Sequence, residues 1–184
     1  MATMEAIQTT YLEAGLSFFD LNPVPATYEY IQAVGQLKSS GTSNATSIWF
    51  QLGDSGGLLS GSIYSDFQMA GLGGTIENVA PRTDQTSGLI YDAATGRGTQ
   101  SDGESIGNFI INFFDYANAN KNTSWSSTTG VQDSYIYGST SGDRRTALTQ
   151  GVVADASTVT RIIIASTGNC ARGSYCTFYG IKSS

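Results

Sequence analysis

Histidine is absent from this sequence of 184 residues. An imidazole is the usual base of Ser-His-Asp and Cys-His catalysis because its pKa lies near neutrality, so both kinds of catalytic group are excluded. A zinc site would have to be built from two cysteines and carboxylates alone. We therefore predict no metal site and no cofactor.

Charged residues are also scarce, at 13% of the sequence, with a net charge of -6. The nine lysines and arginines are scattered apart from the neighbours Arg144 and Arg145, so there is no basic stripe to bind phosphates. No apolar run reaches the roughly 18 residues of a membrane span. Residues 1–8 lack the basic and apolar regions of a signal peptide. We expect no nucleic-acid partner, no membrane partner, and synthesis in a cytoplasm.

Only two cysteines are present, Cys170 and Cys176. They are too few for a disulfide framework, although they could bridge across a hairpin loop. A reducing cytoplasm disfavours that bond, and cysteine often packs as a small apolar residue. We predict two buried free thiols.

The residues that are abundant are typical of a β-protein: 22 glycines, with many neutral polar and aromatic side chains. The length suits one domain. We divide it into N-terminal strands or an arm at 1–26 and a main sandwich at 27–184, with a long loop region at about 71–105. About ten short strands separated by turns predict an all-β fold, a two-sheet antiparallel β-sandwich that is jelly-roll-like.

Hydrophobic patterns predict extended segments, from which the strands are drawn, at 5–12, 16–21, 27–37, from 48 onward, and at 62–70, 75–79, 88–93, 106–116, 123–127, 133–137, 147–153, 158–165 and 175–181. A helix at 5–16 is the alternative for the first of these, although Gly15 weakens it. The segment 106–116 is apolar on both of its faces, so we expect a central strand that is covered on both sides. Ile162, Ile163 and Ile164 form a second run expected to be buried.

Residues 53–57 read Gly-Asp-Ser-Gly-Gly, the nucleophile signature of trypsin-like serine proteases, which also fits the G-x-S-x-G elbow of other hydrolases. Ser55 has no histidine to take its proton, and a lysine base would need to be desolvated. The three lysines, Lys38, Lys121 and Lys182, lie in polar surroundings. We interpret the block as a turn whose glycines can take positive φ, and we predict that the protein is not an enzyme.

A further set of short motifs runs in order along most of the chain. It comprises Ala6-Ile7-Gln8, the corner Pro25 to Tyr28, the strand that enters Gly53 to Gly56, the turn Asp115 to Asn118, and a closing stretch with Gly168, Asn169, Gly173 and Ser174 before Phe178 to Ile181. In these motifs the chain resembles a family of small β-rich virion proteins of tailed bacteriophages. It departs from the family at Leu52, where Asn is usual, at Val153, where tryptophan is common, and at Cys170 and Cys176, which replace aromatic residues.

The resemblance implies an accessory structural role in the virion, in the capsid or the tail, and no reaction. We expect a capsid decoration (cement) protein or a tail-associated jelly-roll subunit, with other virion proteins as its partners. A symmetric homo-oligomer, such as a trimer, is the expected form.

The contact surface is expected in the glycine-rich stretch 94–105, because long loops in compact domains are often functional. The candidate contact residues are Gly96, Arg97, Gly98, Thr99, Gln100, Ser101, Asp102 and Gly103, together with Trp125.

A different class of function is a glycan-binding or host-adhesion module of the phage tail, because sandwich loops rich in Tyr, Trp, Asn and Asp suit sugars. Trp49 lies in an apolar strand and is expected in the core. Trp125 lies among serines and threonines, at either a sandwich edge or an exposed platform. A glycosidase with paired carboxylates and a calcium site at Asp102 to Glu104 are the weakest alternatives, since neither shows a recognisable spacing.

Overall fold

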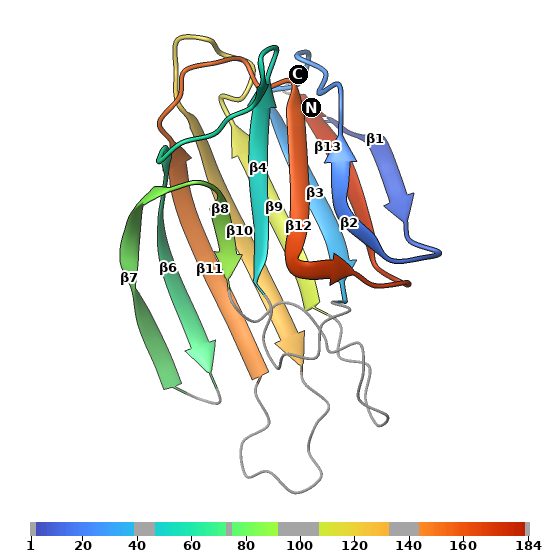
Figure 1. The fold of residues 1–184 in the computed structure, drawn as a ribbon, viewed down its shortest axis with the longest axis vertical. Helices are drawn as coiled ribbons and strands as arrows, with labels where there is room; N and C mark the ends of the chain where they lie inside the picture. The colour runs from blue at the N-terminus through green and yellow to red at the C-terminus, as the bar shows by residue number, and fades with distance from the viewer. Residues whose placement is uncertain (1–2, 39–46, 73–74, 92–106, 133–143, 183–184) are drawn as a thin grey trace, which may run out of the picture.

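The computed structural model describes residues 3–38, 47–72, 75–91, 107–132 and 144–182, which form thirteen strands and no helix (Figure 1). The strands are β1 (Thr3–Tyr11), β2 (Leu16–Leu21), β3 (Tyr30–Leu37), β4 (Ile48–Asp54), β5 (Gly57–Leu58), β6 (Tyr64–Leu72), β7 (Thr75–Gln85), β8 (Gly88–Tyr91), β9 (Gly107–Phe114), β10 (Thr123–Gln132), β11 (Arg144–Val153), β12 (Arg161–Cys170) and β13 (Tyr175–Lys182). In this part of the chain no helix is long and apolar enough to cross a membrane.

The strands form two antiparallel sheets that pack face to face (Figure 1). The larger sheet has eight strands in the order β1-β13-β3-β9-β10-β11-β6-β7. The smaller sheet has five strands, with β2-β12-β4-β5 in a row and β8 paired to β4. In Figure 1 the smaller sheet lies in front of the larger one. The predicted two-sheet antiparallel sandwich is confirmed.

One expectation for the chain's local structure is corrected. Strand β1 pairs with β13 from Thr3 to Tyr11, so the helix considered for 5–16 is wrong. Within the region 71–105, strands lie where we expected them at 75–79 and 88–93, and β7 continues to Gln85. The strand expected at 133–137 lies outside the described residues.

The core between the sheets is centred on the ring of Phe50 in β4. This ring makes edge-to-face contacts with three aromatic rings of the larger sheet, at centroid distances of 5.9 Å to Tyr64, 5.0 Å to Phe113 and 4.8 Å to Trp125. Aromatic pairs in this geometry are worth about 0.5–1.5 kcal/mol each beyond the apolar area they bury. Phe50 is therefore the main aromatic link between the two sheets.

A hydrogen bond also joins the sheets at this place. The hydroxyl of Tyr64 in β6 accepts the backbone N–H of Leu52 in β4 at 2.9 Å. Burial raises the pKa of Tyr64 to about 12, so the hydroxyl stays neutral at any ordinary pH. The alignment of β4 across β6 is thus fixed by a polar contact as well as by packing.

Three inward-facing glycines lie directly opposite aromatic residues on neighbouring strands. Strand register pairs Gly35 with Phe109, Gly88 with Phe50, and Gly151 with Trp125. At each of these glycines a Cβ would collide with the ring opposite. The missing side chain leaves the space into which the ring packs, an arrangement that offsets the low strand propensity of glycine.

We predict that Gly151→Ala lowers the free energy of unfolding by about 2 kcal/mol or more, as overpacking of a filled core does. The added Cβ would meet the Trp125 ring and the carbonyl oxygen of Ser65, and the backbone oxygen cannot move aside. Urea unfolding monitored by tryptophan fluorescence measures the change.

Gly130→Ala on the adjacent strand is the matched control, because nothing lies within 4 Å of a Cβ built there. This substitution should stabilise the protein by about 0.5–1 kcal/mol, since it removes the entropic cost of a strand glycine. Equal effects of the two substitutions would show that Trp125 does not depend on the space above Gly151.

Candidate functional site

Alternation along the strands of the larger sheet points every second side chain away from the core. We call the outward surface of β3, β9, β10, β11 and β6 the open face, because no described strand covers it. Its residues are Tyr30, Gln32, Val34 and Gln36 on β3, Asn108, Ile110, Asn112 and Phe114 on β9, Ser124, Ser126, Thr128 and Gly130 on β10, Thr146, Leu148, Gln150 and Val152 on β11, and Ser65, Phe67, Met69 and Gly71 on β6. All of these described side chains are uncharged, although the chain carries a net charge of -6.

A row of apolar side chains crosses the open face. Strand register places Met69, Leu148, Thr128, Ile110 and Val34 side by side in that order. Met69 and Leu148 are each 45% exposed, and Ile110 is 43% exposed. Phe67, in the next row, is 48% exposed. Large apolar side chains gathered on one surface in this way are typical of a protein contact site.

A shallow hollow of about 250 Å³ lies beside the apolar row. It is lined by Met69, Ala70, Gly71, Thr128, Thr146, Ala147 and Leu148. Register places Gly71 and Gly130 on either side of Thr146, and both positions lack a side chain to fill the surface. The hollow can therefore receive an apolar side chain from a partner.

A row of polar side chains runs parallel to the apolar row. Gln32 Nε2 donates to Asn112 Oδ1 at 2.8 Å, and Asn112 Nδ2 donates to Ser126 Oγ at 3.3 Å. Because these side chains already bond to one another, covering them with another molecule leaves fewer polar groups without a hydrogen-bond partner. Desolvating these three side chains therefore costs less than desolvating unpaired amides and hydroxyls.

The open face corrects our expectation for residues 106–116. Phe109, Ile111 and Phe113 point into the core, but Ile110 and Phe114 of the same strand are exposed. Strand β9 is central in its sheet, as expected, yet the described strands cover only one of its faces. In contrast, Ile162, Ile163 and Ile164 of β12 are all buried, as predicted.

Both tryptophans lie on the opposite side from the one we expected. Trp125 was a candidate contact residue, but it is 2% exposed and packs against Phe50 in the core. Alternation along β10 points its indole inward. Trp49, expected in the core, is half-buried and lies on the outward side of β4, between the inward residues Ile48 and Phe50. The other candidate contact residues, 96–103, lie outside the described residues.

The Gly-Asp-Ser-Gly-Gly block is the turn that we predicted. Asp54 Oδ1 accepts the backbone N–H of Gly56 at 2.7 Å, an Asx-turn, and Gly57 has a φ of 129°. Ser55 is exposed at the tip of this turn. The block connects β4 to β5, so its residues have a clear role in the fold.

Two cysteines and a network around one aspartate are further groups that could take part in chemistry. Cys170 and Cys176 are buried free thiols, as predicted, and burial raises the pKa of both. No group of three or more cysteine or carboxylate side chains that could hold a metal ion occurs in the described part of the chain.

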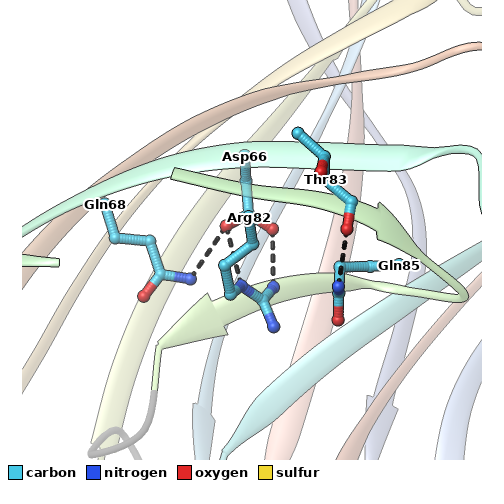
Figure 2. A network of polar contacts seen from close by, with 5 residues as sticks. All are labelled: Asp66, Gln68, Arg82, Thr83 and Gln85. Carbon is cyan, nitrogen blue, oxygen red and sulfur yellow. Dashed lines mark hydrogen bonds and ion pairs between the residues drawn. The ribbon is translucent and has the colours of Figure 1, made fainter. Parts of the chain in front are cut away.

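The acidic network joins the edge strand β7 to β6 (Figure 2). Arg82 donates to both oxygens of Asp66, from Nε at 3.0 Å and from Nη2 at 2.6 Å, and Gln68 Nε2 adds a third hydrogen bond at 3.2 Å. The Asp66 side chain is fully buried, whereas that of Arg82 is 27% exposed. With both carboxylate oxygens occupied, the pair fixes the edge strand and offers no free acid or base.

We predict that Arg82→Ala destabilises the protein by about 3–5 kcal/mol, because it leaves the buried carboxylate of Asp66 without its counter-charge. Arg161→Ala is the control, since Arg161 forms the same bidentate pair with Asp20. Both of these side chains are 31% exposed. Water can replace that partner, so the loss should be smaller. Thermal and urea unfolding measure both, and an equal loss would contradict the role of burial.

Comparison of the chain with protein-family models, with curated proteins and with solved structures found no match. The functional argument therefore rests on the surfaces of the molecule and on the motifs of its sequence.

Proposed function

We propose that the chain is a non-catalytic structural subunit of a bacteriophage virion, as capsid decoration or as a tail-associated subunit, and that it assembles through its open face. The sequence motifs support the virion setting. The observation that carries the proposal is the open face itself, with its exposed apolar row and no charge among its described side chains. A sheet face that remains exposed to solvent normally carries polar and charged side chains at its outward positions.

The partner that we propose for this face is a second copy of the chain. Two copies with a net charge of -6 repel each other, and the uncharged open face is where they can meet without bringing like charges together. A strongly basic partner would instead call for acidic residues on the contact surface, and the open face has none.

The area of the open face supports a stable pair. Five strands spaced about 4.8 Å apart, each contributing about seven residues of 3.3 Å, cover about 550 Å². Strands β13 and β1 continue the surface with uncharged outward residues: Tyr175, Thr177, Tyr179 and Ile181, then Met4, Ala6, Thr9 and Tyr11. With them the area rises to about 800 Å², which is what each partner contributes to a standard interface.

The shape of the open face also suits self-association. The exposed ring of Phe67 and the hollow beside Leu148 lie on the same surface. A two-fold axis between them would place Phe67 of each copy against the hollow of the other, which is the self-complementary arrangement of a symmetric dimer. A trimer, the form we expected from the sequence, would need a different contact.

We predict that the wild-type chain pairs at micromolar concentration and that Leu148→Lys weakens pairing by about 100-fold or more. A lysine in the centre of the contact is left without a counter-charge, at a cost of about 3 kcal/mol or more. Light scattering after size-exclusion chromatography, together with sedimentation velocity, measures the association.

Thr86→Lys is the control, because Thr86 is exposed in the turn between β7 and β8 and is not part of the open face. It adds the same charge and should leave pairing unchanged. Since Leu148 is exposed in the single chain, both variants should melt at the wild-type temperature when monomeric. A wild-type chain that stays monomeric, or a Leu148→Lys variant that pairs normally, would refute the proposal.

A further inference from the structure

The outward face of the smaller sheet carries a row of aromatic residues. Register pairs Ala165 of β12 with Phe18 of β2 on one side and with Trp49 of β4 on the other. Phe18 and Trp49 are half-buried, so part of each ring is accessible. Paired residues on adjacent strands share a face, so both rings lie on the side of β12 that points away from the core.

The residues between and beside the two rings on β12 are apolar. Ala165 is 1% exposed and Ile163 of the next row is 4% exposed, although both point outward and neither belongs to the core cluster. The surrounding side chains therefore lie over them. Phe18 and Trp49 are separated by two strand spacings, about 10 Å. Two aromatic side chains are thus held on one face of the smaller sheet, with Ala165 at the paired position between them.

Polar groups border this aromatic row. Asp20 is paired with Ile163, and its carboxylate accepts Nε and Nη2 of Arg161 at 2.9 and 2.8 Å. Each of these two side chains is 31% exposed. A guanidinium has five N–H donors, so the pair with Asp20 leaves others free to bond a ligand. On the other side, Gln51 donates from Nε2 to the carbonyl of Thr86 at 3.3 Å and leaves its amide oxygen as an acceptor.

We propose that this face binds a neutral β-linked oligosaccharide. The apolar faces of two sugar rings would stack on Phe18 and Trp49, and the sugar hydroxyls would bond to Arg161, Asp20 and Gln51. Rings two strand spacings apart match alternate sugars of an extended β-1,4-linked chain, which turn the same face to one side. Aromatic side chains offer an apolar surface at low entropic cost, while fixed polar groups give orientation.

The proposed sugar site is independent of the assembly proposed above. The open face belongs to the larger sheet, and the aromatic row lies on the opposite outer surface of the sandwich (Figure 1). Pairing through the open face leaves the aromatic row uncovered in both copies. An assembled protein would therefore present two sugar sites, and either proposal can fail without the other.

Titration calorimetry with cellohexaose and chitohexaose tests the sugar site, with the α-linked maltohexaose as the comparison probe. At least one of the β-linked probes should bind with a Kd below about 1 mM and maltohexaose more weakly by about tenfold. Trp49→Ala and Phe18→Ala should each lower the affinity by about tenfold or more. Leu148→Lys, on the other sheet, should leave it unchanged.

A second measurement uses the unaltered chain and so does not depend on the folding of a variant. N-bromosuccinimide should oxidise Trp49 before Trp125, because Trp125 is buried, and a bound β-linked probe should protect Trp49. Mass spectrometry of the peptides locates the oxidation. The proposal falls if neither β-linked probe binds at about 1 mM, if maltohexaose binds equally well, or if binding leaves Trp49 as reactive as before.

Discussion

The packing of Phe50 against Tyr64, Phe113 and Trp125 is the interaction on which the rest of the structure depends. One ring of the smaller sheet meets three rings of the larger sheet, and Gly88 leaves room beside it. Because side chains alternate along a strand, fixing these rings inward also fixes which residues point outward. The open face and the aromatic row are both consequences of this one arrangement.

The two outer surfaces differ in the chemistry that they expose. The described side chains of the open face are large apolar groups, amides and hydroxyls without charge, whereas the smaller sheet carries a paired carboxylate and guanidinium beside its aromatic residues. A surface of the first kind favours contact with another protein surface, since no charged side chain among its described residues has to be desolvated. A surface of the second kind can orient a polar ligand. On our two proposals, the sandwich separates a surface for assembly from a surface for ligand recognition.

The fold could be predicted from the sequence because its strands follow hydrophobic alternation and glycine-rich turns separate them. The hydrophobic pattern alone could not show whether both apolar faces of β9 are covered. Ile110 and Ile111 are the same residue type, and only the packing of the second sheet makes one exposed and the other buried. The structure supplies that difference.

The two tryptophans show why neighbouring residues can mislead. Trp125 stands among serines and threonines and so looked exposed, yet inward positions on β10 and β11 include buried Ser127 and Thr149. Trp49 stands among apolar residues and so looked buried, but alternation points it outward. The pair of Asp66 and Arg82 was also beyond sequence reasoning, because two register shifts between β6 and β7 decide which residues meet.

The central claim is that the open face is a contact between subunits. Electron cryomicroscopy of the assembled particle tests it most directly, because the density shows which outer surface of the sandwich is covered. Our account predicts that the larger sheet packs against a second copy, with Phe67 and Leu148 buried near a two-fold axis. A particle in which the open face is turned to solvent, with subunits joined through other surfaces, would contradict it.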